Sequence, residues 1–301
     1  MPTTTFIRRS LTAALLVAAV ALTAPVRPSQ AAPAATAVRE LSIPYTAYNG
    51  ETSHASVLVP ASYDPQSDPP LPLVISPHGR GLDGTTNARL WGSLPALGGF
   101  AVVNADGMGL HLSGRYSWGA PGQIADLARM PAILRTELPW LRIDQKRVYA
   151  VGGSMGGQET LLLLARHPGL LAGAVAVDPM VDFPRQYRNF ASRSVQGLAR
   201  REVGGTPATA PAAFAARSPL TFVRGIASSA TPLQIWWTRT DRVIVDSQLH
   251  SGLLVRRIRK LNPRAPLTVV VGTWQHTAVL RWDRSLPAML VGLGLITAAD
   301  A

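Results

Sequence analysis

Residues 148–157 read Val-Tyr-Ala-Val-Gly-Gly-Ser-Met-Gly-Gly, and they carry the clearest structural signal in the sequence. A valine-rich run ends at a serine between glycines, and a helix-forming run, 158–164, follows at once. This order predicts a buried strand, a sharp turn with Ser154 at its apex, and a helix. The strained turn needs small residues two positions to either side, which Gly152 and Gly156 supply. The helix N-terminus behind the turn favours negative charge that develops beside the serine hydroxyl.

Strands and helices alternate on both sides of this turn. Apolar runs predict strands at 38–45, 53–60, 71–76, 100–105, 148–153, 171–177, 233–238 and 267–271, and helices over 87–97, 124–138, 155–167, 247–261 and 288–299. Such alternation predicts a mostly parallel sheet covered by helices on both faces, with ligands bound beyond the carboxyl ends of the strands. Residues 180–230 break the rhythm, and we interpret them as a small cap insertion.

Composition bounds the protein class. The 301 residues are 47% hydrophobic and can bury the core of a single domain, which we place at 32–301 with its cap insertion. The net charge of +12 comes from scattered arginines without a nucleic-acid motif, so we expect no nucleic-acid partner. The chain has no cysteine, which excludes thiol catalysis and zinc–thiolate sites. With no metal-ligand spacing either, we expect no cofactor and no metal.

The first 31 residues are typical of a secretory signal peptide. Arg8 and Arg9 precede an apolar run over 11–24, and Ser29-Gln30-Ala31 fits the small-x-small cleavage pattern. The arginine pair also partly matches a twin-arginine signal. The apolar run 288–299 is too short to span a membrane and predicts a buried helix. We therefore expect a secreted or extracytoplasmic protein with no stable membrane insertion after removal of the signal.

Three groups suited to acyl transfer follow three predicted strands, in the order Ser154, Asp241, His276. Serine is a poor nucleophile at its own pKa and needs a base within hydrogen-bonding reach. Histidine titrates in the range that this role needs, and a carboxylate fixes its tautomer and supports the imidazolium. Their order and placement predict a catalytic triad.

Each member of this triad has competitors. Asp178, Asp182 and Asp246 are the other candidate acids, and Asp241 also suits a helix cap or an ion pair with a neighbouring arginine. The remaining histidines are His54, His78, His111, His167 and His250. For His167 and His250, at the ends of predicted helices, we expect surface positions.

Two loops complete the predicted site. Pro77-His78-Gly79-Arg80-Gly81 follows an early strand, where an acyl-transfer enzyme needs a flexible loop whose backbone N–H groups face an oxyanion; a structural histidine in a glycine-rich turn is the alternative. Tyr116 and Trp118 lie in a second loop that suits a pocket wall.

The sequence resembles the α/β-hydrolase superfamily, and within it the catalytic domain of prolyl-oligopeptidase-type serine hydrolases and related secreted esterases. The likeness covers about 55–295. It rests on Pro77-His78-Gly79, Gly153-Ser154-Met155-Gly156-Gly157, Arg217-Ser218-Pro219, Thr240-Asp241-Arg242-Val243-Ile244 with Ser247-Gln248, and Gln275-His276.

The resemblance implies a nucleophile at Ser154, an acid at Asp241 and a base at His276. It also implies an oxyanion hole formed by the backbone N–H of Met155 and one from Gly79 or Arg80. Oligopeptidases of this type carry a large N-terminal propeller, and we expect none here, because only about 40 residues separate the expected cleavage site from the first core strand. This departure weakens the inference of peptidase activity from the resemblance.

We therefore expect a secreted serine hydrolase that cleaves small-molecule carboxylic esters through an acyl-enzyme intermediate. A small prolyl-oligopeptidase-like peptidase or amidase acting on short peptides is the alternative, and a non-catalytic binding protein on a hydrolase scaffold is a more remote one. The cap has few large aliphatic residues, which favours short acyl groups over lipid chains. It carries seven arginines that could pair an anionic substrate group: Arg185, Arg188, Arg193, Arg200, Arg201, Arg217 and Arg224.

Overall fold

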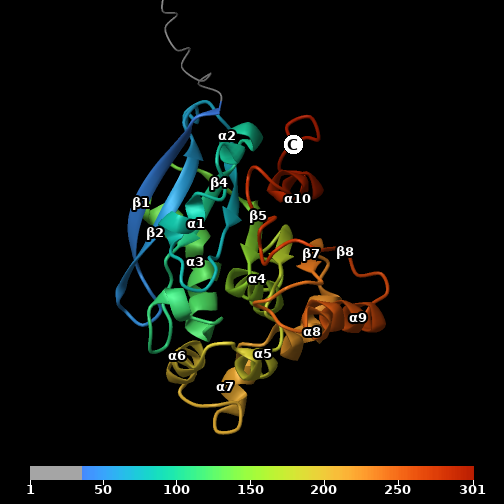
Figure 1. Cartoon of the computed structure of the whole chain (residues 1–301). Helices are drawn as coiled ribbons and strands as arrows, with labels where there is room; N and C mark the ends of the chain where they lie inside the picture. Colours follow the sequence, from blue (N-terminus) through green and yellow to red (C-terminus); the bar gives the residue numbers. More distant parts are fainter. Residues whose placement is uncertain (1–35) are drawn as a thin grey trace, which may run out of the picture. The chain divides into compact units, whose positions relative to one another are not determined.

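The computed structural model describes residues 36–301, in which one eight-stranded sheet lies between two layers of helices (Figure 1). The expected signal peptide, 1–31, lies outside the described residues. The strands are β1 (Val38–Thr46), β2 (Thr52–Pro60), β3 (Leu71–Ile75), β4 (Ala101–Ala105), β5 (Ile143–Gly153), β6 (Gly173–Val177), β7 (Leu233–Thr238) and β8 (Leu267–Gly272), in the spatial order β1-β2-β4-β3-β5-β6-β7-β8. Strand β2 pairs antiparallel with both β1 and β4, and the other neighbours are parallel. The predicted α/β-hydrolase fold with a mostly parallel sheet is confirmed.

Helices cover both faces of the sheet, as the alternation predicted. One face carries α3 (Pro121–Glu137), α4 (Met155–Arg166), α8 (Val223–Ser228) and α9 (Ser251–Leu261), and the other carries α1 (Gly84–Ala88), α2 (Leu94–Gly98) and α10 (Leu286–Gly292). Helix α3 shows how the sequence specifies this packing. Its apolar residues, spaced by three and four, are fully buried against the sheet: Ile124, Leu127, Met130 and Leu134. No helix within 36–301 is long and apolar enough to cross a membrane.

Three predicted helices differ in extent from the observed ones, and glycines account for two of these differences. The helix predicted at 87–97 is two short helices, because Gly92 adopts a φ of +50° and Trp282 packs where a side chain on it would lie. The helix predicted at 247–261 begins with a separate 3-10 turn, η4 (Ser247–Leu249), before α9. The last helix is buried as expected but ends at Gly292, with Gly294 at a φ of +69° just beyond it.

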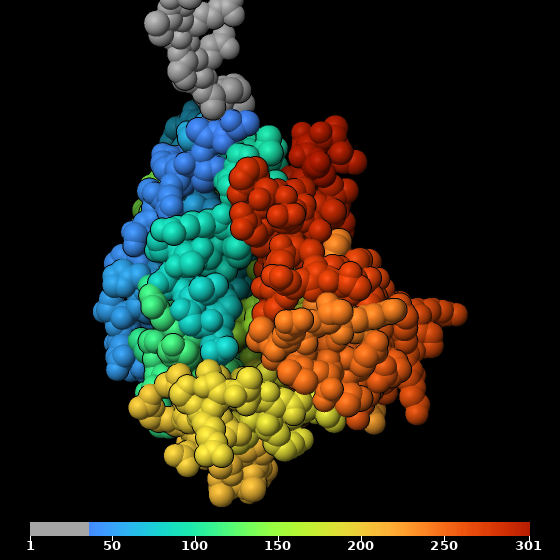
Figure 2. Space-filling model, viewed as in Figure 1, coloured from blue at the N-terminus to red at the C-terminus, as the bar shows by residue number. Residues whose placement is uncertain are grey.

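The segment between β6 and β7 forms a cap over the carboxyl ends of the strands. It contains α5 (Phe183–Asn189), α6 (Arg193–Val203) and α7 (Pro211–Ala216), and η3 (Pro219–Phe222) then leads back to α8. Figure 2 shows this yellow to light-orange segment at the lower end of the described domain. Its interior is aromatic. The ring centroids of Phe183 and Phe214 are 4.7 Å apart, and Phe183 also stacks on Trp118 of the core. The cap is therefore packed against the site rather than detached from it.

A buried carboxylate of the cap joins it to the core, and an ion pair within the cap supports this carboxylate. Glu202 of α6 accepts backbone N–H groups from Leu110, His111 and Leu112 at 2.6–2.9 Å, and Arg217 donates to it at 3.0 Å. Both charged side chains are almost fully buried. Separating them would leave a buried charge without a partner, which is strongly destabilising.

His250 is fully buried, so the expected surface position for this histidine is wrong. Its Nδ1 accepts the backbone N–H groups of Val181 and Asp182 at 3.4 Å, and its Nε2 has no partner among the described residues. Burial lowers the pKa of His250 to about 4. The neutral ring is therefore part of the folded structure where the chain enters the cap.

This burial predicts acid sensitivity. An exposed histidine binds a proton below about pH 6.5, whereas folded His250 does so only near pH 4, so the free energy of unfolding should fall as pH drops between these values. We expect a loss of about 3 kcal/mol from this group over that window. Urea unfolding of wild type and His250→Gln at pH 7 and pH 4.5 measures it, and the variant should show the smaller pH dependence. His54→Gln, at an exposed position, is the control; an equal pH dependence in wild type and His250→Gln would contradict the prediction.

Candidate active site

Ser154 sits at a strained turn between β5 and α4, as predicted. Its φ of 57° and ψ of −120° are rare for a residue with a side chain, and its N–H donates to Val177 O at 2.9 Å. A methyl group on Gly156 would lie 2.1 Å from Pro77 O, and one on Gly152 would lie 2.4 Å from Gly156 O. The two glycines thus let the helix start directly behind the serine, which lifts its hydroxyl above the sheet.

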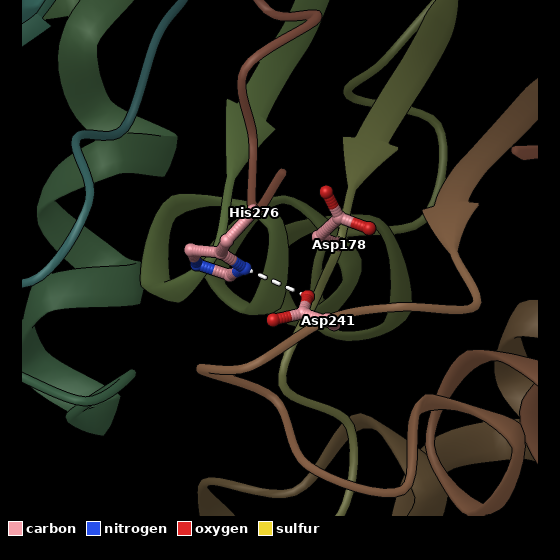
Figure 3. Close-up of side chains that lie close together, drawn as sticks. All are labelled: Asp178, Asp241 and His276. Carbon is pink, nitrogen blue, oxygen red and sulfur yellow. Dashed lines mark hydrogen bonds and ion pairs between the residues drawn. The ribbon is translucent and has the colours of Figure 1, made fainter. Parts of the chain in front are cut away.

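His276 and Asp241 form a hydrogen-bonded pair on the loops that follow β8 and β7 (Figure 3). The Nδ1 atom of His276 lies 2.8 Å from Oδ2 of Asp241, whose side chain is 1% exposed. The other oxygen, Oδ1, accepts the backbone N–H groups of Val243 and Ile244 at 2.7 and 2.9 Å, which fixes the carboxylate. A carboxylate only accepts, so Nδ1 carries the hydrogen and Nε2 is left as the acceptor.

The second ring nitrogen of His276, Nε2, makes no hydrogen bond within the described residues, and the turn that carries this histidine packs beside the serine turn. The Nε2 atom is also shielded from solvent. The next residue, Thr277, contacts the backbone just before the serine, because a methyl group on Gly153 would lie 3.0 Å from Thr277 Cγ2. An unpaired basic nitrogen on a turn that packs next to a serine can take the hydroxyl proton once the two groups come within hydrogen-bonding distance.

The other candidate acids make different contacts. Asp178 is buried and binds N–H groups of neighbouring loops, with no hydrogen bond to His276. Asp182 caps α5 by accepting the N–H of Arg185 at 3.0 Å. Asp246 is exposed and lies 4.0 Å from the Arg185 guanidinium. Of the four acids considered from the sequence, Asp241 alone is hydrogen-bonded to this histidine.

Within 36–301, one group of three acidic or histidine side chains is spaced closely enough to hold a metal ion. Ligand atoms of Asp178, Asp241 and His276 lie within 4.8 Å of one another. However, His276 Nδ1 is already bound to Asp241, and both oxygens of Asp178 accept N–H groups. The donor set is therefore occupied by protein hydrogen bonds.

The loop after β3 lies against the serine and has a structural histidine beneath it. A methyl group on Gly79 would lie 4.0 Å from Ser154 Cβ. The buried ring of His78 holds the loop, with Nδ1 2.9 Å from Gly79 O and Nε2 3.0 Å from Asp106 O. Met155 is the first residue of α4, where a backbone N–H has no intrahelical partner. Backbone donors on Met155 and on the 79–80 segment thus flank the serine.

Two hollows meet at Val243, which lines both. The first is lined by Ser154 and by side chains from the core and cap, and its volume is only about 20 Å³. Its other lining residues are Arg80, Trp118, Met155, Met180, Gln186, Phe190 and Ile244. The second, about 410 Å³, is lined by Thr240, Arg242, Gln275 and His276 in addition to Val243. The serine side of the site is therefore tight and largely apolar, and the histidine side is wide and polar.

The arginines of the cap do not line these hollows. Arg217 is buried against Glu202, and Arg185 lies 3.8 Å from Asp182. The arginine beside Ser154 is instead Arg80, which is half-buried and whose guanidinium has no hydrogen bond or ion pair within the described residues.

Several site residues escape prediction from the sequence. Met180, Phe190 and Ile244 line the serine hollow, but nothing in their local pattern distinguishes them from core residues. Glu159, one turn into α4, is buried, which raises its pKa, and accepts the hydroxyl hydrogen of Ser117 at 2.5 Å. It ties the loop of Trp118 to α4. The sequence does carry a signal for Glu159, because it is a charged residue in a largely apolar helical run.

Comparisons by sequence identify a family but no individual relative. A profile of the prolyl oligopeptidase family matches residues 94–245, just over half of the chain. This range includes Ser154, Asp178 and Asp241. No curated protein matches the chain.

Comparisons of structure give the same fold at low identity. Serine hydrolase F (FphF) of Staphylococcus aureus, which binds fluorophosphonates, is 15% identical with a TM-score of 0.65, covering 85% of this chain and 98% of that one. The S-formylglutathione hydrolase of the same organism is 16% identical, with a TM-score of 0.64 and coverages of 85% and 99%. Dipeptidyl peptidase 4 of Porphyromonas gingivalis is 17% identical, with a TM-score of 0.63, covering 85% of this chain. The match spans 35% of that peptidase, so the chain corresponds to about a third of its length.

Proposed function

The chain belongs to the prolyl oligopeptidase family of serine hydrolases, and we propose that it is an exported esterase that cleaves carboxylic esters with short acyl groups. The proposed triad is Ser154 as nucleophile, His276 as base and Asp241 as the acid that orients it. The observation that carries this assignment is the 2.8 Å bond from His276 Nδ1 to Asp241, which leaves Nε2 without a partner among the described residues, on a turn that packs against Gly153.

The reaction follows from this arrangement. His276 Nε2 takes the proton of Ser154 as Oγ attacks the ester carbonyl, and Asp241 stabilises the imidazolium that forms. The N–H groups of Met155 and of Gly79 or Arg80 donate to the oxyanion. His276 then gives its proton to the leaving alcohol, and water attacks the acyl-enzyme with the same base.

The two hollows support one orientation of the ester, with its acyl group in the serine hollow and its leaving group in the histidine hollow. The acyl group lies beside the oxyanion donors, hence in the hollow of Ser154 and Met155, whose 20 Å³ is close to the space of a single water molecule. The leaving group lies beside the acid that protonates it, hence in the 410 Å³ hollow of His276. A small acyl group and a larger alcohol fit this asymmetry. Ester cleavage also asks less of His276 than expulsion of an amine.

Export rests on the basic, then apolar, start of the chain and on the cleavage pattern that ends at Ala31. N-terminal sequencing of protein from the culture medium or periplasm tests it. A mature N-terminus near Ala32 supports export, whereas an intact N-terminus in the cytosol contradicts it.

A series of p-nitrophenyl esters tests the substrate preference. We expect kcat/KM for the acetate and butyrate to exceed that for the palmitate by about 100-fold or more, because a tight hollow discriminates steeply with chain length. A proline p-nitroanilide peptide should be a poorer substrate than either short ester. A higher kcat/KM for the palmitate ester would contradict the acyl preference, and one for the peptide would favour the peptidase alternative.

Phe190 offers a matched variant, because its ring lines the serine hollow at the end of α5. Phe190→Ala should raise kcat/KM for the octanoate ester relative to the acetate. Phe222→Ala changes the same residue type where its ring packs beneath Arg166, and it should leave the ratio unchanged.

A further inference from the structure

Asp178 is a buried carboxylate next to the site that the proposed reaction does not use. We propose that it is a positioning residue, which holds the turn of His276 and the end of β7 in register with the serine turn. The inference rests on the proposed hydrolase function and adds a fourth side chain to the machinery.

The carboxylate is occupied on both oxygens by groups from two other strand ends. Oδ1 accepts the backbone N–H of Thr238, the last residue of β7, at 2.7 Å. Oδ2 accepts the indole N–H of Trp274 at 3.0 Å and the backbone N–H of Thr277 at 2.8 Å. Trp274 and Thr277 bracket His276, so a single carboxylate holds its turn on both sides. Figure 3 shows Asp178 at the end of its strand, beside the pair that His276 forms with Asp241.

The backbone is strained at both residues that the bond from Thr277 N to Asp178 Oδ2 joins. Thr277 has a φ of 53° and Asp178 a φ of 43°, a region that residues with side chains seldom occupy, and β-branched ones least of all. Such conformations persist only where the surroundings over-determine them. The bond from Thr277 N to Asp178 Oδ2 is the contact that joins the two strained residues.

Asp178 also follows the residue that fixes the nucleophile. Val177 O accepts the N–H of Ser154, and Asp178 N donates to Trp236 O of β7. Two consecutive residues at the end of β6 therefore bind the serine turn, the end of β7 and the turn of His276. This connection sets where Nε2 lies relative to the serine hydroxyl.

A surface role does not account for this carboxylate. Asp178 is 2% exposed, and burial raises its pKa, whereas its N–H donors favour the ionised form. A charged group in such surroundings is kept only where hydrogen bonds compensate for lost hydration.

The first test is Asp178→Asn. Its amide oxygen can accept from Thr238, but its NH₂ group then faces the two donors of the His276 turn, which lose their acceptor. We expect kcat to fall about 10–100-fold, because a displacement of the base by about 1 Å has costs of this size. KM should change less than about threefold. Rates are divided by the concentration of sites that react with a fluorophosphonate, so misfolded protein does not contribute.

The second test removes one donor without altering the charge. Trp274→Phe keeps an aromatic ring and should lower kcat several-fold. Because it acts through the same hydrogen bonds, the double variant should lose no more than Asp178→Asn alone. Asp182→Asn is the matched control at an acid of the same loop and should leave kcat per site unchanged.

These outcomes separate the proposal from its alternatives. A lower melting temperature with unchanged kcat per site in Asp178→Asn would show a purely structural role and overturn it. Multiplicative losses in the double variant would overturn it too. If Asp178→Asn does not fold, an unchanged kcat in Trp274→Phe decides against it. A wild type that neither reacts with fluorophosphonate nor hydrolyses esters would instead refute the proposed function itself.

Discussion

Replacement of Ser154 by alanine is expected to lower kcat for p-nitrophenyl acetate by about 10⁴–10⁶-fold, with the protein still folded. Alanine removes the atom that forms the acyl-enzyme in the proposed mechanism, and oxyanion donors alone should give only a small residual rate. This corresponds to about 5–8 kcal/mol of activation free energy. His276→Ala should have a similar effect, because Oγ then has no base.

Fluorophosphonate labelling checks this result independently of the substrate chosen. Wild type should be labelled and Ser154→Ala should not. Ser194→Ala, at an exposed position in the cap, should be labelled like wild type. Labelling of Ser154→Ala at the wild-type rate would show that the nucleophile lies elsewhere. Absence of labelling and activity in wild type would favour a binding protein on a hydrolase scaffold.

Replacement of Asp241 by asparagine should lower kcat by about 10⁴-fold, although the two side chains have nearly the same shape. The carboxylate accepts on both oxygens, from His276 and from the N–H groups of Val243 and Ile244. An asparagine whose oxygen accepts from the backbone turns its NH₂ group toward Nδ1. That group stabilises the wrong tautomer, in which Nε2 carries the hydrogen and cannot accept a proton.

Asp246→Asn provides the control for this change. Asp246 lies five residues further along the same loop but is exposed, so its replacement should leave kcat within about threefold of wild type. An unaffected Asp241→Asn enzyme, together with an inactive Asp178→Asn enzyme, would show that the acid had been assigned to the wrong aspartate.

The fold could be predicted from the sequence because its signals are local. The glycines around Ser154 and the apolar spacing of α3 each specify an element from a short window. Gly92 shows the limit of such a window: its positive φ is fixed by a turn that packs against Trp282, 190 positions away. The break in the predicted helix at 87–97 depends on that distant contact.

The site residues likewise differ in whether a local stretch of sequence identifies them. Ser154 carries its own motif, whereas the choice of Asp241 over Asp178 depends on which of two acids at strand ends meets His276. That geometry is set by contacts between residues 35 and about 100 positions apart. The same limit explains His250, whose position at a helix end suggested exposure, although its ring is enclosed by the chain entering the cap.

The contact between Glu202 of the cap and the backbone of residues 110–112 has a consequence for how substrate reaches the serine. The carboxylate of Glu202 accepts the N–H groups of residues 110–112, so a cap that swung open as a lid would leave three amide hydrogens without their partner and the carboxylate bound to Arg217 alone. The cap should therefore behave as a fixed roof, and substrate should pass beneath its edge, between Phe190 and Val243. In hydrogen exchange, the amides of 110–112 should be protected to nearly the free energy of global unfolding, although the loop that bears them lies partly at the surface.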